Sequence, residues 1–338
     1  MPDAASRYCR LHPSHVPHSS SPPASCSSAL LLCLLALFSA AAAENSLLPF
    51  LPLLPVPTDR QPRQGDGVGG EGYTILPVLR NEQPATVIIL HGMGSTGEAW
   101  GFLSLALSFF SLNYVKFIIP TAPLTHVTYL DKQLRSWYDI RTFRQSAAAN
   151  LSSLTPAQLL NLVDIDRPQF DNAVERVNDI IRSEVERGVN PQRILLLGFS
   201  QGGALALHAF LRSPWSLAAV IGVATWIPFI QEYPSAMSPA TRNRHMLLMH
   251  GTDDTAVPYV FAQYLANRLS SFRSNVNFTT FAGEPHVILN VQVIETIEHF
   301  VSQRAPGTMR YLDKLINDMT EKFGSLSSRL ESVPNVSM

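Results

Sequence analysis

The sequence has few charged residues and no excess of basic ones. Only 15% of its 338 residues are charged, whereas soluble domains usually carry about 25%. Lys and Arg number 25 against 26 Asp and Glu, so the chain lacks the basic surplus that binds nucleic-acid phosphates. We therefore expect no nucleic-acid partner. The hydrophobic content of 46% also excludes a disordered polyanion.

Cysteine is also scarce, and its distribution divides the chain. Cys9, Cys26 and Cys33 all precede Gly72, and the 266 residues after Gly72 contain none. Ten of the 25 prolines lie in the same N-terminal part, whereas the later part keeps a low charge content of about 16%. That later part has neither cysteine nor an H-x-x-x-H spacing, so we expect no metal site and no cofactor.

An uncharged run of 15 residues, Ala29–Ala43, precedes Glu44. Its length suits a secretory signal and is short of the roughly 18–20 residues that span a membrane. We expect residues 1–43 to be a signal peptide or a signal anchor, which implies the secretory pathway or a membrane surface; a transit sequence and a cytoplasmic-facing location stay open. The Pro- and Gly-rich residues 44–72 read as a linker.

After the linker, short apolar runs alternate with helical patterns. Continuous apolar strands are typical of a parallel sheet that is buried on both faces. We expect a doubly wound α/β domain over residues 73–303, with a mostly parallel sheet and helices on both faces. The expected strands are Tyr73–Leu79, Thr86–His91, Val115–Pro120, Arg193–Gly198, Ala219–Ala224, His245–His250 and Asn277–Phe281. The expected helices are Glu98–Ser111, Pro168–Arg187, Gln201–Arg212, Tyr259–Ser271 and Val287–Gln303.

One strand runs through Gly198-Phe199-Ser200-Gln201-Gly202 directly into a helix. This pattern predicts a nucleophile elbow, in which a tight turn between small residues exposes a serine hydroxyl. The helix N-terminus behind Ser200 favours the negative charge of a tetrahedral intermediate. Outside this context, a G-x-S-x-G match is common by chance and marks only a turn.

A catalytic serine needs a histidine, and this fold supplies its partners in the order Ser, acid, His. His286 follows the last expected strand in a loop, where it would reach the serine. His299 lies within the last expected helix, away from its apolar face, and reads as a solvated residue. We therefore expect His286 to be the base. Asp253 and Asp254 both follow the strand before it, and spacing alone leaves the acid open, because either could instead cap the next helix.

The oxyanion hole needs a second backbone N–H from a loop after an early strand. His91-Gly92-Met93-Gly94-Ser95-Thr96-Gly97 is such a turn, and we expect the N–H groups of Met93 and Gln201 to be the donors. A phosphate cradle is the alternative, but the turn lacks the Lys-Ser/Thr ending of a P-loop. His91 and His250 read as structural histidines at strand ends.

Four blocks, in this order, resemble the acyl-protein thioesterase / phospholipase–carboxylesterase family of α/β hydrolases. They are LHGMGSTGEAW (90–100), IIPTAPLTHVTYLDKQLRSWYDI (118–140), GFSQGGALAL (198–207) and HGTDDTAVP (250–258), followed by Gly283-x-x-His286. The resemblance implies that Asp254 is the acid and that Met93 and Gln201 are the oxyanion donors. It also implies that Trp137 and Gly92 border the substrate. Ser95 and Val287 depart from the family pattern beside the site.

These features predict a serine hydrolase that cleaves acyl thioesters or esters through an acyl-enzyme. The expected substrate is an S-acylated protein, and small carboxylic esters and lysophospholipids are the alternatives. From another class, a non-catalytic α/β-hydrolase-fold binding protein also stays open. Residues 304–338 carry apolar residues at helical spacing and read as an amphipathic helical extension. The sequence does not predict an oligomeric state.

Overall fold

The computed structural model of this chain describes the greater part of the expected catalytic domain. The described residues are 72–75, 84–144, 154–155, 158–159, 161–272, 274–286 and 290–307, and all belong to one unit, Val56–Met338. The expected leader (1–43), the linker up to residue 71 and the extension beyond residue 307 lie outside them. Within the described residues, no helix is both long enough and apolar enough to cross a bilayer.

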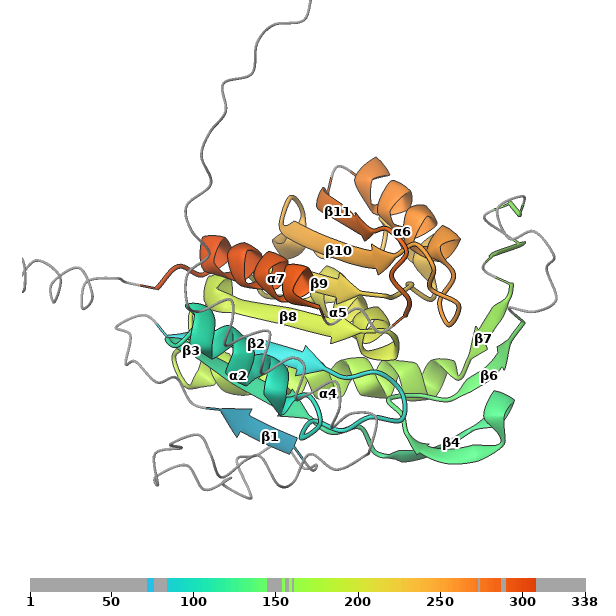
Figure 1. Cartoon of the computed structure of the whole chain (residues 1–338), viewed down its shortest axis with the longest axis horizontal. Helices are drawn as coiled ribbons and strands as arrows, with labels where there is room; N and C mark the ends of the chain where they lie inside the picture. Colours follow the sequence, from blue (N-terminus) through green and yellow to red (C-terminus); the bar gives the residue numbers. More distant parts are fainter. Residues whose placement is uncertain are drawn as a thin grey trace, which may run out of the picture. The chain divides into compact units, whose positions relative to one another are not determined.

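The described residues form a seven-stranded sheet, and six of the strands are parallel (Figure 1). The first strand pairs antiparallel with its neighbour at one edge. This arrangement confirms the expected mostly parallel sheet. In spatial order the strands are β1 (Gly72–Ile75), β3 (Val115–Pro120), β2 (Ala85–Leu90), β8 (Ile194–Phe199), β9 (Ala219–Val223), β10 (His245–Gly251) and β11 (Asn275–Phe281).

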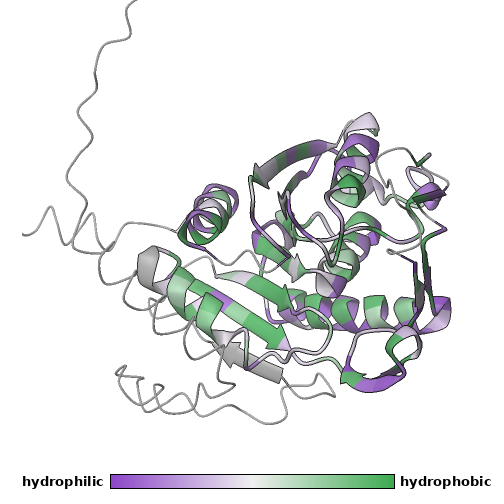
Figure 2. Ribbon diagram, turned by 45° about the vertical axis from the view of Figure 1, so that its right-hand side comes forward, coloured by the Kyte–Doolittle hydropathy of each residue, from purple (hydrophilic) through white to green (hydrophobic). Residues whose placement is uncertain are grey.

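Helices cover both faces of the sheet, as the continuous apolar strands predict. Two helices, α2 (Gly101–Phe110) and α7 (Val291–Arg304), lie on the near face in Figure 1. The other face carries α4 (Arg167–Glu186), α5 (Gln201–Arg212) and α6 (Tyr259–Ser271). Figure 2 shows hydrophobic residues along the central strands and polar residues on the outer sides of the helices.

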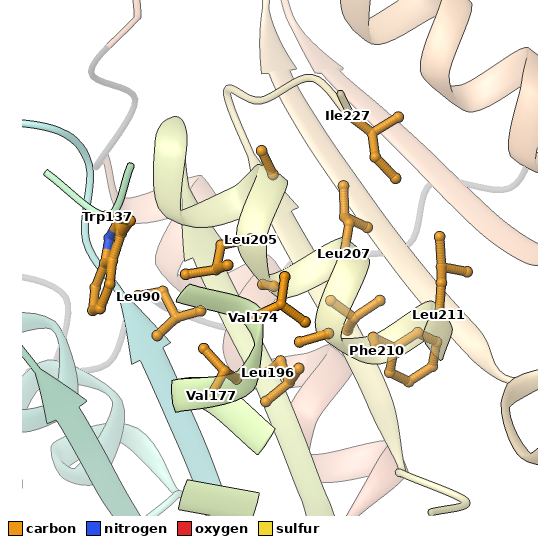
Figure 3. Packing of buried hydrophobic residues seen from close by; sticks show 14 of the residues in the cluster. Leu90, Trp137, Val174, Val177, Leu196, Leu205, Leu207, Phe210, Leu211 and Ile227 are labelled. Carbon is orange, nitrogen blue, oxygen red and sulfur yellow. The ribbon is translucent and has the colours of Figure 1, made fainter. Parts of the chain in front are cut away.

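The hydrophobic core beneath α4 and α5 is formed by those strand residues that point to one face of the sheet. Successive strand residues point to opposite faces, and Leu90 and Leu196 belong to the cluster on the α4–α5 face. Val174 and Val177 of α4 and Leu205 of α5 belong to the same cluster (Figure 3). The cluster fixes α5, and therefore its N-terminus, against the sheet.

The helix boundaries follow local capping chemistry. Asp166 caps α4 by accepting from the Gln169 N–H, and Pro168 lies in the first turn, where its missing N–H costs no hydrogen bond. The last helix begins at Val291, because the Asn290 side chain accepts from the Val293 N–H. The expected start at Val287 was therefore too early.

Two short antiparallel pairs were not expected from the sequence. They are β4 (Leu124–Val127) with β5 (Lys132–Arg135), and β6 (Ile140–Phe143) with β7 (Val163–Ile165). The described residues also form the 3₁₀ turns η2 (Thr128–Leu130), η5 (Pro191–Arg193), η6 (Ile230–Glu232) and η7 (Pro239–Thr241).

Candidate active site

Ser200 occupies a strained turn between β8 and α5. Its backbone angles are φ 53° and ψ −119°, in the left-handed half of conformational space that costs a non-glycine residue about 1–3 kcal/mol. The chain passes so closely here that a Cβ on Gly198 would lie 2.2 Å from the Gly202 carbonyl oxygen, and one on Gly202 would lie 2.2 Å from that of Leu90. The predicted elbow is therefore present, and its two glycines are sterically required.

Hydrogen bonds from the neighbouring strand hold this strained residue. The Ser200 N–H donates to the Val223 carbonyl at 2.9 Å, and the Thr225 hydroxyl donates to the Ser200 carbonyl at 2.7 Å. Both partners lie at or just after the end of β9. The end of β9 therefore holds the backbone of Ser200 in place through two hydrogen bonds.

His286 lies in the loop between β11 and α7, and its Nε2 atom is 3.0 Å from Ser200 Oγ. Its ring packs against the Phe199 ring with a centroid distance of 5.0 Å, and the Trp100 ring lies 5.1 Å beyond Phe199. The Trp100 indole N–H in turn donates to Ser95 Oγ at 3.1 Å. The first of the two departures from the family pattern, Ser95, thus supports the stack behind His286. The second, Val287, lies outside the described residues.

Asp254, and not Asp253, meets the histidine. Its Oδ2 atom is 2.7 Å from His286 Nδ1, and its Oδ1 atom accepts from the N–H groups of Ala256 and Val257 at 2.9 and 2.7 Å. Asp253 is exposed and accepts from the Thr252 hydroxyl. Neither aspartate caps α6, whose N-cap is Pro258.

The charge state of Asp254 fixes how its histidine partner is protonated. Burial raises the pKa of Asp254, but hydrogen bonds from His250 and His286 outweigh it and lower the pKa to about 2. The carboxylate is thus ionised and can only accept. His286 Nδ1 must then carry the proton of that bond, which leaves Nε2 free to accept from the Ser200 hydroxyl.

The turn after β2 passes close to Ser200. A Cβ on Gly92 would lie 2.9 Å from the Phe199 ring and 3.5 Å from Ser200 Cβ. The N–H groups of Gly94 and Ser95 donate to the carbonyls of Arg135 and Gly92 at 2.7 and 3.2 Å. Met93, whose N–H is an expected oxyanion donor, lies within this turn.

His91 supports the same turn as a neutral, buried residue. Its Nε2 accepts from the Ala122 N–H at 3.0 Å, and its Nδ1 donates to the Gly92 carbonyl at 2.7 Å. Burial lowers the pKa of His91 to about 4. The expectation of a structural histidine at this position agrees with these contacts.

Gln201 is the first residue of α5, and the first N–H groups of a helix have no acceptor within it. Its buried side chain anchors this end of the helix. The amide oxygen accepts from the Trp137 N–H at 3.0 Å, and the amide nitrogen donates to the Tyr138 carbonyl at 2.9 Å and to Ser136 Oγ at 2.8 Å. The helix N-terminus is thereby tied to the segment that carries Trp137.

Trp137 lies in the core beneath the turn after β2. Its indole N–H donates to the His91 carbonyl at 2.8 Å, and its ring lies 5.0 Å from the His91 ring. Its side chain is 5% exposed. It supports the turn that carries Gly92 and Met93, and it does not line the cavity described next.

An apolar cavity of about 170 Å³ opens between β7, α6 and the loop after β9. The triad residues do not line it. Trp226, one of its lining residues, follows Thr225, whose hydroxyl donates to the Ser200 carbonyl. Sequence reasoning missed this cavity, although the run Trp226-Ile227-Pro228-Phe229 directly after a predicted strand was a usable signal. Its apolar lining includes Val163, Trp226, Ile227, Phe229, Phe261 and Leu265.

A buried histidine that sequence reasoning also missed fixes the loop lining this cavity. His208, in α5, donates from Nε2 to the Pro228 carbonyl at 2.5 Å, and its Nδ1 accepts from the Tyr233 hydroxyl at 2.8 Å. Burial lowers the pKa of His208 to about 3. No short sequence motif marks it, because its partners lie 20 and 25 residues away.

The sheet, the strand–turn–helix serine and the loop histidine together define an α/β hydrolase. A sequence model described as phospholipase/carboxylesterase matches residues 78–304. The chain is 27% identical to acyl-protein thioesterase 1 of Gibberella zeae over 67% of its own length and 93% of that protein. It is 32% identical to acyl-protein thioesterase 1 of Schizosaccharomyces pombe over 55% of its length and 77% of that protein.

Among solved structures, Arabidopsis thaliana SOBER1 is similar, with a TM-score of 0.58 and 26% identity over 65% of this chain and 99% of that one. The family match covers well over half of the sequence. The protein belongs to the phospholipase/carboxylesterase family, as the sequence resemblance predicted, and it is a hydrolase.

Proposed function

We propose that this hydrolase cleaves acyl thioesters and esters with Ser200 as its nucleophile and that its substrate is an S-acylated protein. The observation that carries the proposal is the chain of contacts from Asp254 through His286 to Ser200, at 2.7 and 3.0 Å. A serine beside a histidine that is oriented by a buried carboxylate is the arrangement of an activated nucleophile.

In the proposed reaction, His286 Nε2 takes the proton of Ser200 as Oγ attacks the acyl carbon. The negative charge that develops on the acyl oxygen is stabilised by the N–H groups of Met93 and Gln201 and by the N-terminus of α5. Protonated His286 then donates to the departing sulfur or oxygen. Water, deprotonated by the same histidine, attacks the acyl-enzyme and releases the carboxylic acid.

The acyl group is proposed to lie in the cavity beyond Trp226, with Gly92 and Trp137 bordering the reacting end. The cavity is about 170 Å³, and a cavity of about 150 Å³ holds one benzene ring. It therefore accommodates only part of a long acyl chain. The S-acylated substrate is supported by the relatives, two of which are named acyl-protein thioesterases. Small esters and lysophospholipids are the competing substrates.

A comparison of substrates tests this function. Hydrolysis of a palmitoyl-peptide thioester, a short p-nitrophenyl ester and a lysophospholipid is measured with the full chain and with the variants Ser200→Ala and His286→Gln. We expect the highest kcat/KM on the thioester and a loss of at least about 10³-fold in both variants. Faster hydrolysis of the lysophospholipid would replace the proposed substrate, and full activity of either variant would reject the mechanism.

We also propose that residues 1–43 direct the protein to the secretory pathway or to a membrane. The proposal is supported by the uncharged run Ala29–Ala43 and by the small residues before Glu44. N-terminal sequencing of the native protein tests it. A start near Glu44 indicates a cleaved signal, an intact run in a membrane fraction indicates an anchor, and an intact run in a soluble cytoplasmic protein contradicts both.

A further inference from the structure

A second histidine contacts the proposed catalytic acid. His250 lies near the end of β10, is 1% exposed and places Nε2 2.8 Å from the Val257 carbonyl oxygen. A carbonyl only accepts, so this nitrogen carries a proton. The same nitrogen is 3.1 Å from Asp254 Oδ2. The N–H of His250 therefore lies near two acceptors, the Val257 carbonyl and the Asp254 carboxylate.

With His250 counted, the Asp254 carboxylate has a donor for nearly every lone pair. Oδ1 accepts from Ala256 and Val257, and Oδ2 is shared between His286 and His250. A carboxylate offers about four acceptor positions. Three of the four donors belong to the strand and loop that carry Asp254. Only the fourth, His286, also contacts the proposed nucleophile Ser200.

Val257 closes this arrangement into a small ring of contacts. Its N–H donates to Asp254 and its carbonyl accepts from His250. Rotation of the carboxylate would therefore break contacts to both the loop and the strand end. These contacts orient Oδ2 toward His286 independently of the bond that His286 itself makes.

We infer that His250 is a positioning residue for the acid, acting through Asp254 on the proton affinity of His286. The inference rests on the proposed function of the triad. A donor on the charged carboxylate makes Asp254 a weaker base, and so weakens its pull on the imidazolium form of His286. Removing the donor should leave a more basic and less firmly held carboxylate.

The other ionisable groups around this cluster are few and can be controlled. Tyr259 of α6 lies 6.2 Å, ring to ring, from His250. Asp253 is exposed in the same turn, and Glu284 accepts from Asn290 beside the His286 loop. None of them contacts Asp254 among the described residues, so a change in the pH profile on altering His250 reports on the His250–Asp254 contact.

The experiment compares His250→Leu, which removes the donor, with His250→Gln, whose amide can restore one near the Nε2 position. His245→Leu, at the opposite end of the same strand, is the matched control. For each, kcat, KM and the pH dependence are measured on a p-nitrophenyl ester, and the active fraction is counted with a fluorophosphonate. The imidazole of His286 is titrated separately by NMR.

We expect kcat of His250→Leu to fall about tenfold per active site with KM little changed. The midpoint of the acidic limb in its pH–rate profile and the NMR titration midpoint of His286 should both rise by about half a pH unit. His250→Gln should recover most of both effects, and His245→Leu should show neither. An unchanged His286 midpoint in a folded His250→Leu, with activity lost only in proportion to active sites, overturns the inference.

The two proposals fail in distinguishable ways. If the wild-type chain hydrolysed none of the esters, the proposed function would be wrong. The NMR midpoint of His286 would still report on the contact between His250 and Asp254. A shift of that midpoint in His250→Leu supports the inference, and an unmoved midpoint rejects it.

Discussion

At the scale of single residues, the sequence was informative where chemistry is tied to a local turn. The strand–turn–helix around Ser200 predicted the elbow, because only small residues fit at 198 and 202. Position in a loop separated His286 from His299, which is exposed on α7 and contacts Gln303. Spacing could not separate Asp253 from Asp254, because the backbone path after β10 decides which side chain turns inward.

The elbow glycines give a residue-scale prediction. In Gly202→Ala, the new Cβ would overlap the backbone carbonyl oxygens of Leu90, the last residue of β2, and of His91, which follows it. We expect a fall in stability above about 3 kcal/mol and a large loss of kcat. Urea unfolding and steady-state kinetics measure both effects.

Gly94→Ala is the control for the elbow variant. Gly94 has φ +82° and no atom within 4 Å of a new Cβ. Its substitution therefore tests backbone strain alone, and we expect the free energy of unfolding to fall by about 1 kcal/mol. Equal effects of the two substitutions would show that the close approach at the elbow is not what requires glycine.

The side chain of Gln201 gives a second prediction at this scale. Gln201→Leu removes both hydrogen-bonded ties to the Trp137–Tyr138 segment and leaves buried backbone groups unpaired. Because its own N–H is a proposed oxyanion donor, we expect kcat to fall about tenfold or more, with KM changed less. Kinetics normalised to fluorophosphonate-labelled sites measure this. An unchanged kcat would show that the helix end does not need this tie.

At the scale of elements, the strength of the hydrophobic pattern decided what could be predicted. The central parallel strands have continuous apolar centres and were located to within about two residues. The pairs β4–β5 and β6–β7 were missed because they are short and partly exposed, with polar sequences such as LTHV and KQLR. The start of α7 was missed because the capping role of Asn290 outweighs the apolar residues before it.

The cavity beside β7 gives an element-scale prediction about the acyl chain. Val163 is half-buried at the start of β7 and lines the cavity. Val163→Phe adds bulk at this wall, so kcat/KM for a long-chain acyl thioester should fall about tenfold relative to an acetyl ester. The adjacent Leu162→Phe, which does not line the cavity, should leave the ratio unchanged. Equal ratios in the two variants would place the acyl chain elsewhere.

At the scale of the whole molecule, two buried neutral histidines make stability depend on pH. The pKa is about 4 for His91 and about 3 for His208, against 6.5 in the unfolded chain. Between these values the unfolded chain binds more protons, so stability is full above about pH 6.5 and falls as the pH decreases. Each histidine adds a slope of about 1.4 kcal/mol per pH unit.

Urea unfolding at several values between pH 7.5 and 4.5 measures this slope. His208→Leu should remove about half of it, even though the variant is less stable at every pH because Tyr233 and the Pro228 carbonyl lose their partner. His299→Leu, which alters an exposed histidine on α7, should keep nearly all of it. A free energy of unfolding that stays constant from pH 7 to 5 contradicts the burial argument.

The low charge of the chain also has a whole-molecule explanation. The central strands β2, β8, β9 and β10 are buried on both faces, and α5 is buried along almost its entire length. A sheet covered on both sides therefore removes polar positions from several strands and one helix at once. This part of the fold was predictable from composition together with strand pattern.

The most direct measurement of the central claim is covalent labelling of the folded chain with a fluorophosphonate, read by intact mass and peptide mapping. We predict one adduct per molecule, located on Ser200, with no adduct in Ser200→Ala and much slower labelling in His286→Gln. Ser111→Ala, at the distant end of α2, should label like the wild type. An adduct on another residue, or labelling that persists in Ser200→Ala, would contradict the assignment of Ser200 as the nucleophile.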